Sequence, residues 1–257
     1  MPAMHRSLFA GLVLAALLSS DALAGGCPAH YLGGQLPEIR NPKLAQSTQE
    51  LCYGVFGVMH SGVTRTPLWS AELLKSGNIA QAHALSRENS FHAEPRLPSG
   101  VRAELADYAH SGYDRGHMAP NGDMPDRETQ HESFTLANMV PQDAENNRHL
   151  WAGIEGAVRG MAKKDGELYV VTGPAFIGGS LQKVGHVLVP THLYKAVYSP
   201  RQNAGAAWFV ENKGDAEVQT ISITELEGKI GINLMPALSA QQKQAMLRLP
   251  TIRKGRK

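Results

Sequence analysis

Polar residues whose types suit acid–base chemistry and anion binding lie together in the middle of the chain. His117 stands in the run Asp114-Arg115-Gly116-His117-Met118-Ala119-Pro120. An imidazole with its ordinary pKa of about 6.5 is largely neutral, yet still basic, at physiological pH, so it can take a proton from water. The guanidinium of Arg115 stays charged and can hold two phosphoryl oxygens at once. The run can therefore supply a general base and an anion clamp for hydrolysis of a phosphate ester.

A second group of polar residues follows in the run Asn146-Asn147-Arg148-His149-Leu150-Trp151. Magnesium prefers oxygen ligands and keeps several waters, so one or two protein oxygens can hold it. Either asparagine could supply one, and either could instead cap the start of a helix. Glu155 lies eight residues after Asn147, which on a helix is about 80° around the axis. Both side chains can therefore face one cleft.

Two more segments recur in order with these runs, Leu136-Ala137-Asn138-Met139-Val140-Pro141-Gln142 and Val171-Thr172-Gly173-Pro174. Together the segments closely resemble the DNA/RNA non-specific endonucleases, a branch of the ββα-metal or His-Me finger nucleases. The signature of that family is Asp-Arg-Gly-His followed by Ala-Pro. The resemblance covers nearly all of the chain after residue 24.

The resemblance implies a role for each of three residues. His117 is expected to be the general base that activates water. Asn147 is expected to be the single direct ligand of Mg²⁺, with Mn²⁺ able to substitute, and the spacing to Trp151 and Asn138 favours Asn147 over Asn146. Glu155 is expected to hydrogen-bond metal-bound waters. Alternatively, Glu155 is an ordinary exposed glutamate that forms an ion pair with Arg159, one turn later on the helix.

The same resemblance indicates residues that contact the substrate. Arg115 and Arg87 are expected to clamp the phosphate, and Asn138 to position the base or the substrate. The match at Arg87 has slightly altered spacing, so a neighbour such as Arg96 could take its place. The alternative for Asn138 is a buried asparagine in a turn.

Two further residues of the first run are expected to support the site. Asp114 is interpreted as structural, holding Arg115 or the loop backbone in place. Gly116 is expected either to let the backbone pass close to the substrate or to adopt a backbone conformation that is not accessible to other residue types.

The implied function is that of a magnesium-dependent endonuclease that hydrolyses DNA and RNA to 5′-phosphate products without regard to sequence. Contacts to phosphates carry no base information, and the sequence shows no recognition helix or paired zinc module. DNA and RNA are the expected partners, a protein inhibitor is a possible further one, and the oligomeric state stays open. Two alternatives are a zinc phosphoesterase that uses His110, His117 and His131, and a non-catalytic binding module.

The elements that must position these residues are indicated by hydrophobic patterning. Segments 51–60 and 67–74 are β-prone around Ser61-Gly62 and predict a hairpin. Segments 168–172, 186–189, 193–198 and 206–210 are further strands, most simply in an antiparallel sheet. A long polar stretch over 76–141 lacks helical or strand periodicity and predicts a functional loop. Apolar residues at helical spacing over 147–162 predict an amphipathic helix of about four turns.

The overall composition is that of an ordinary folded protein. The chain has 257 residues, of which 42% are hydrophobic and 19% charged, and its net charge is +2. We predict a single domain over 25–257, because no internal linker is visible. The predicted fold class is α+β, with a mixed, mainly antiparallel central sheet, flanking helices and a ββα-metal motif. The last ten residues are basic and are interpreted as a solvated end or as an arm that contacts phosphates.

The N-terminal segment has the pattern of a signal peptide over 1–24, ending in Ala22-Leu23-Ala24. The apolar run 8–18 is shorter than the roughly 20 residues of a membrane-spanning helix, so no stable membrane insertion is expected. Export to the periplasm or beyond would let Cys27 and Cys52 form a disulfide. The alternative is a lipoprotein with Cys27 acylated.

Overall fold

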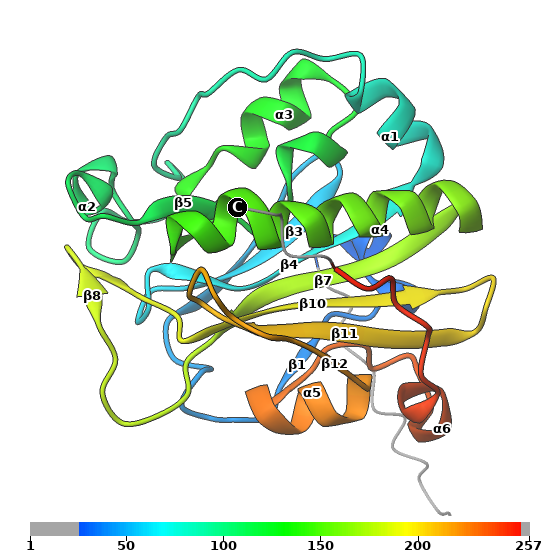
Figure 1. Ribbon diagram of the computed structural model, residues 1–257. Helices are drawn as coiled ribbons and strands as arrows, with labels where there is room; N and C mark the ends of the chain where they lie inside the picture. Colours follow the sequence, from blue (N-terminus) through cyan, green and yellow to red (C-terminus); the bar gives the residue numbers. More distant parts are fainter. Residues whose placement is uncertain (1–25, 253–257) are drawn as a thin grey trace, which may run out of the picture.

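The computed structural model describes residues 26–252, so the predicted signal peptide and residues 253–257 lie outside the described residues. A seven-stranded sheet forms the centre of the fold (Figure 1). In spatial order its strands are β12 (Val218–Ile221), β11 (Ala204–Glu211), β10 (His192–Ser199), β7 (Glu167–Ala175), β4 (Thr66–Lys75), β3 (Phe56–Ser61) and β2 (Thr48–Cys52). All neighbouring strands in this sheet are antiparallel. The predicted α+β class is confirmed, and the sheet is wholly antiparallel rather than mixed.

Helices cover both faces of the sheet. Helix α4 (Ala152–Asp165) crosses one face together with α1 (Ser76–Ala82), and α5 (Ile223–Ile230) lies against the other (Figure 1). Successive side chains of β10 point to opposite faces of the sheet. Tyr194 and Ala196 pack towards α5, while Leu193 and Val197 pack towards α4. The sheet therefore separates two hydrophobic cores.

Smaller elements complete the face that carries α5. They are the 3₁₀ turns η1 (Pro28–His30) and η2 (Leu32–Gly34), the strand pair β1 (Glu38–Ile39) and β13 (Ile232–Asn233), and α6 (Ala240–Gln244). Ser222 caps α5 by accepting a hydrogen bond from the backbone N–H of Glu225, and Gly231 ends the helix with φ of 69°. The cap and the glycine fix the length of α5.

The stretch over 76–141, predicted as an irregular loop, contains a series of short elements. They are α1, α2 (Leu105–Tyr108), β5 (Asp114–His117), η3 (Asn121–Asp123), α3 (Arg127–Ser133), η4 (Leu136–Asn138) and β6 (Met139–Gln142). Local capping stabilises some of them, as where Asp126 and Thr129 form a reciprocal capping box at the start of α3. Elements of three to seven residues are too short to show a hydrophobic period, which is why the prediction missed them.

The predicted strands mostly lie where expected, with two differences. The β3–β4 hairpin is confirmed, but the segment 51–60 is broken between β2 and β3, where the Tyr53 N–H donates to Phe56 O. The segment 186–189 forms β9 (Val187–Leu188), which pairs only with β8 (Lys183–Val184) in a small separate hairpin.

The ββα motif consists of β5, β6 and the helix that follows. Strands β5 and β6 pair antiparallel, with Gly116 opposite Val140. The next element is a π-helical turn, η5 (Asn146–Trp151), which continues directly into α4. The predicted helix over 147–162 is therefore a wide first turn joined to an α-helix. Such π turns frequently occur at functional sites.

Cys27 and Cys52 form the predicted disulfide, with their Cα atoms 5.5 Å apart. The bond fastens the start of the described chain to β2 and leaves no free thiol at Cys27 for acylation. Among residues 26–252, no helix is both long and apolar enough to cross a membrane.

Candidate active site

A polar cleft of about 390 Å³ lies where β5 meets the start of α4. Its lining includes five of the six residues that the sequence predicted for the site: Arg87, Arg115, His117, Asn147 and Glu155. Asp114, Pro120, Asn121, Arg148 and Ala152 complete it. Residues that are up to 68 positions apart, from 87 to 155, thus converge on one cleft.

His117, at the end of β5, is 8% exposed and packs against two phenylalanines. Its ring lies edge-on to Phe134 at 4.9 Å between centroids and tilted against Phe91 at 5.8 Å. Nε2 is buried without a hydrogen-bond partner, which leaves Nδ1 as the ring nitrogen towards the cleft. Burial, and secondly the charge of Arg87, lowers the pKa of His117 to about 3. The imidazole is therefore neutral at physiological pH and able to accept a proton.

Gly116 is required by packing between the paired strands. A Cβ at this position would lie 1.9 Å from Oε1 of Gln142, whose side chain comes from β6. The residue has no positive φ, so the conformational reason expected from the sequence does not apply. Close packing of Gln142 on β5 explains the glycine.

Asn147 is held by Asp114 in an orientation that suits a cation ligand. Its Nδ2 donates to Oδ2 of Asp114 at 2.9 Å. The nitrogen end of the amide is thereby engaged, and the oxygen end, which is the atom that Mg²⁺ prefers, remains for an ion in the cleft. Asp114 also receives two hydrogen bonds from Arg148, at 2.9 and 2.7 Å. These contacts lower the pKa of Asp114 despite its partial burial. Asp114 thus positions Asn147 and Arg148 by hydrogen bonds, whereas the expectation from the sequence was that it holds Arg115 or the loop backbone.

Asn146 points into the protein and is fully buried. Its Oδ1 accepts from Gln142 at 2.9 Å, and its Nδ2 donates to the backbone carbonyls of Glu211 and Lys213 at 3.1 and 3.0 Å. All of its strong hydrogen-bonding groups are used within the fold. Of the two neighbouring asparagines, only Asn147 lines the cleft.

Glu155 lies about two turns beyond Asn147 and lines the same cleft. Burial raises the pKa of its carboxyl group to about 7, against the opposing charges of Lys195 and Arg159. The alternative ion pair with Arg159 does not form, because Nη1 of Arg159 donates to Asp123 at 2.9 Å. The carboxylate is therefore available to groups in the cleft.

Two arginines reach the cleft, and the third candidate does not. Arg115 stacks on Phe91 with its Cζ 4.1 Å from the ring centroid, and Arg87 lies 5.2 Å over Phe134. Arg96 instead pairs with Glu94 at 2.7 Å and donates to the carbonyl of Cys52. It is absent from the cleft lining, so Arg87 rather than Arg96 is the residue placed to contact an anion there.

Asn138 is not brought into the cleft. It is fully buried, and its Oδ1 accepts from Ser70 and from the backbone of Ala119 at 2.7 and 2.9 Å. Its Nδ2 donates to the carbonyls of Ala119 and Ser133, both at 2.9 Å. With every group engaged, the amide has no donor or acceptor left for a substrate. Asn138 therefore matches the alternative given in the sequence analysis, a buried structural asparagine. Its side chain holds the backbone two residues after His117.

A buried charged group lies beneath the cleft and was not found from the sequence. Lys195, 1% exposed on β10, donates to Thr172 Oγ1 at 2.6 Å and to the carbonyl of Met118 at 3.3 Å. Burial lowers the pKa of Lys195 and raises that of Glu72, and each charge opposes the shift of the other. A lysine within an apolar strand gives no sequence signal, because its partners come from other strands.

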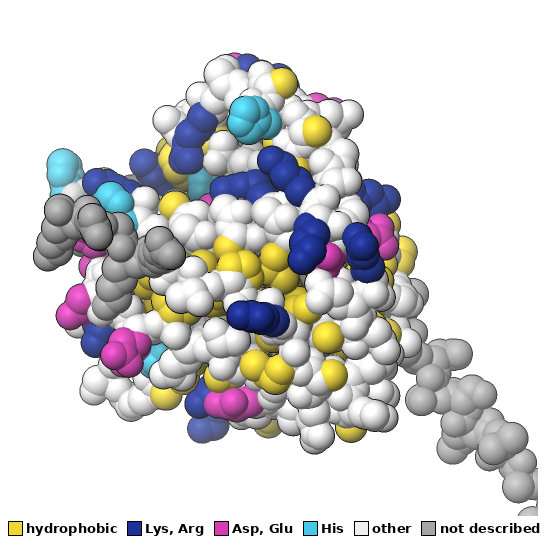
Figure 2. Space-filling model, turned by 45° about the vertical axis from the view of Figure 1, so that its right-hand side comes forward, with side chains coloured by type: hydrophobic (Ala, Val, Ile, Leu, Met, Phe, Trp, Pro, Cys, Tyr) yellow, Lys and Arg dark blue, Asp and Glu magenta, His cyan; other side chains and the backbone are white. Residues whose placement is uncertain are grey.

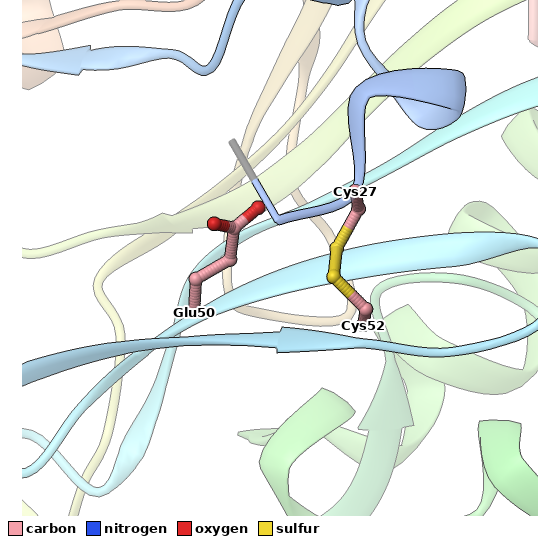
Figure 3. A group of neighbouring side chains, drawn as sticks. All are labelled: Cys27, Glu50 and Cys52. Atoms are coloured by element: carbon pink, nitrogen blue, oxygen red, sulfur yellow. A yellow bond between two sulfur atoms is a disulfide. The ribbon is translucent and has the colours of Figure 1, made fainter. Parts of the chain in front are cut away.

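The histidines of the zinc alternative do not form a cluster. Within residues 26–252, the one group of three potential ligands is Cys27, Glu50 and Cys52, shown in Figure 3. Its sulfur atoms are joined in the disulfide, and Glu50 accepts hydrogen bonds from Gly26 and Tyr31. This group is therefore structural, and a site that combines His110, His117 and His131 has no support in the described residues.

The fold and the cleft define an α+β protein with a ββα-metal motif, and comparison with known proteins agrees. The family model described as "DNA/RNA non-specific endonuclease" matches residues 37–241. The chain belongs to this family, whose members are metal-dependent nucleases.

Individual relatives cover parts of the chain. Nuclease C1 of Cunninghamella echinulata is 40% identical over 150 residues, which are 53% of this chain and 60% of that protein. The mitochondrial nuclease EXOG of Danio rerio is 35% identical over 200 residues, 69% of this chain and 58% of that protein. The chain thus matches about three fifths of the length of these relatives.

A solved structure shares the fold. A chain in the crystal structure of the EndoG/EndoGI complex superposes with a TM-score of 0.69 at 25% identity, covering 75% of this chain and 88% of that one. That complex concerns the mechanism of EndoG inhibition.

Proposed function

We propose that this protein is an exported, magnesium-dependent endonuclease that hydrolyses phosphodiester bonds of DNA and RNA to 5′-phosphate products, with little regard for sequence. The observation that carries the proposal is the convergence of a neutral imidazole and a fixed amide on one cleft. Membership of the endonuclease family supports the same reaction class.

His117 and the arginines have separate tasks in this proposal. Nδ1 of His117 takes a proton from the attacking water, since the imidazole is neutral at physiological pH and keeps a lone pair for the proton. Arg115 and Arg87 bind phosphoryl oxygens and hold the scissile group in line with the water. Packing against Phe91 and Phe134 excludes bulk water from the far side of the imidazole.

Asn147 and Glu155 would hold the ion. The amide oxygen of Asn147 is the direct ligand, and the carboxylate of Glu155 orients waters around the ion. When bound, Mg²⁺ supplies positive charge at the phosphate and at the leaving 3′ oxygen. Mn²⁺, which accepts the same oxygen ligands, is expected to substitute.

The substrate range follows from what the cleft offers. Its cationic side chains Arg87 and Arg115 suit phosphates, which DNA and RNA share. Lys and Arg side chains also gather across the upper half of the face drawn in Figure 2. Binding should therefore be independent of base sequence and should weaken with added salt.

Export and domain organisation belong to the same proposal. The signal-peptide pattern over 1–24 and the Cys27–Cys52 disulfide both suit an oxidising compartment, the periplasm or the exterior. We propose a single endonuclease domain over 25–257 after cleavage of this peptide.

The test is cleavage of plasmid DNA and of structured RNA, each with Mg²⁺ and with excess EDTA. The wild type should degrade both only with the metal. His117→Ala should lose about 10²- to 10⁴-fold in kcat while binding DNA nearly normally, because only the proton transfer is removed. Asn147→Ala should lose Mg²⁺ affinity in calorimetry as well as activity.

His83→Ala is the matched control, since His83 is an exposed histidine at the end of α1 and does not line the cleft. It should cleave like the wild type. Cleavage in excess EDTA would refute the metal role, and normal turnover by His117→Ala would remove that residue from the reaction.

A further inference from the structure

Two phenylalanines connect the residues of the cleft to one another. Phe134, at the end of α3, is fully buried, and Phe91 meets it edge-on with the ring centroids 4.8 Å apart. The segments that carry them are tied together, because His92 N–H donates to Phe134 O and Leu136 N–H donates to His92 O. The two rings therefore form one rigid unit.

Three functional side chains rest on this unit. Arg115 lies over the face of Phe91 at 4.1 Å, Arg87 over Phe134 at 5.2 Å, and the imidazole of His117 packs edge-on to Phe134 at 4.9 Å. Side chains as long as arginine normally sample many rotamers. Stacking on a fixed ring restricts that freedom before any substrate binds.

Stacking through the ring face has a chemical advantage for an anion clamp. The N–H donors of a guanidinium lie in its plane, so contact through the face leaves them free to reach oxygens at the edge. Arg87 uses two of its donors on the amide oxygens of Asn89 and Asn121, which are neutral and leave its charge uncompensated.

Arg96 shows the contrasting arrangement in the same molecule. It also stacks on an aromatic ring, that of Tyr53 at 4.5 Å, and Tyr53 in turn stacks on Phe56. Yet its Nε and Nη2 donate to the carboxylate of Glu94 at 2.7 and 3.1 Å. Its charge and its donors are used inside the fold, as expected of a structural arginine.

We propose that Phe91 and Phe134 are positioning residues of the active site, which hold Arg115 and Arg87 by the ring face so that their in-plane N–H groups remain available to the phosphate. The T-shaped contact with Phe134 fixes the plane of His117 in the same unit. This inference rests on the proposed function, since it assigns the two rings to residues of that site.

The experiment is a double-mutant cycle on plasmid DNA that combines Phe91→Leu with Arg115→Gln. Leucine keeps the apolar volume but removes the ring face. Phe91→Leu alone should lower kcat/KM about tenfold, and Phe91→Tyr, which restores a face, should recover most of that loss. In the Arg115→Gln background, Phe91→Leu should cost clearly less than in the wild type, because the contact with Arg115 is already gone and only the tilted contact of Phe91 with His117 at 5.8 Å remains to be lost.

A second cycle and a control complete the design. Phe134→Leu with Arg87→Gln should also be non-additive, but with a residual loss because Phe134 contacts His117 as well. Phe56→Leu removes a ring from the Tyr53–Arg96 stack, so it should lower the melting temperature without changing kcat/KM.

Additive losses in both cycles, or an equal fall in kcat/KM for Phe56→Leu, would overturn the positioning role. Wild-type cleavage by Arg115→Gln would overturn the proposed clamp itself, which is a distinguishable failure.

Discussion

The two faces of the central sheet differ in what they bury. Towards α5, the strands present an apolar layer that includes Trp69, Tyr194 and Phe209. Towards α4, the same strands place Glu72, Thr172 and Lys195 among apolar neighbours. Buried polar groups cost stability unless they are paired. Both faces bury charge, but on the α5 side it is a direct ion pair of Lys243 with Glu227 at 2.8 Å, whereas on the α4 side it lies next to the cleft.

The polar group on the α4 face connects the sheet with the cleft. Lys195 donates to the carbonyl of Met118, the residue after His117, and its charge acts on both Glu72 and Glu155. We therefore expect substitutions on the α4 face to change activity as well as stability. Substitutions on the α5 face should change stability alone.

The largest effect is expected for Lys195→Met. Loss of the buried ammonium leaves Thr172 Oγ1 and the Met118 carbonyl without their donor, which typically costs about 1–3 kcal/mol for each group, and it removes the positive charge that opposes the raised pKa of Glu72. The free energy of unfolding, measured by urea denaturation, should fall by about that amount, and kcat should fall with it because the backbone beside His117 loses its support. The double variant Lys195→Met/Glu72→Gln should recover part of the stability. No recovery would show that Glu72 is not the main partner.

Leu226→Ala tests the other face. Leu226 is fully buried on α5, and truncation of a buried leucine costs about 2–5 kcal/mol. The urea midpoint should fall strongly, whereas kcat/KM measured well below the transition should match the wild type. A large loss of kcat/KM in the folded variant would show that the two faces are coupled.

The disulfide lies on the same side as α5, since Cys27 packs in that core, so its removal should also leave activity unchanged. Cys27→Ser/Cys52→Ser opens a loop with a sequence separation of 25 residues, for which the chain-entropy model gives about 3 kcal/mol. The melting temperature of the double variant should match that of the reduced wild type. A higher melting temperature for the variant than for the oxidised wild type would contradict the prediction.

The smallest effect is a pH dependence on the α4 face. Burial raises the pKa of Glu155 to about 7, so the carboxylate is charged above that pH and takes up a proton below it. Mg²⁺ affinity, measured by calorimetry, should therefore fall by up to about tenfold per pH unit below 7. Glu155→Gln should bind the ion more weakly and with little dependence on pH between about 5.5 and 8. An equally steep dependence in that variant would assign the effect to another group.

The sequence predicted the site better than it predicted the elements that carry it. Arg115, His117, Asn147 and Glu155 were predicted because a recognisable motif fixes their order, and all four line the cleft. Asn138 belongs to a motif as well, yet it lies inside the fold. A motif records which residues occur together, but not which of them face the substrate.

The ββα motif was predicted, but its strands were not located, and the other parts that were missed also depend on contacts between distant segments. The pairing of β5 with β6 joins residues far apart in the chain, as Asp114 with Gln142 and His117 with Met139. The roles of Phe91 and Lys195 likewise arise from partners on other elements. Contacts between distant segments produce no repeating hydrophobic pattern in the neighbouring sequence, so they are seen only in the folded chain.

The wide turn at η5 has a consequence for how this chain tolerates changes in length. Each residue of an α-helix advances by about 100° around the axis. Deletion of one residue between Asn147 and Glu155 would therefore rotate the two relative to each other by roughly that angle and point one of them away from the cleft. The number of residues between Asn147 and Glu155 therefore helps decide whether both side chains line the cleft.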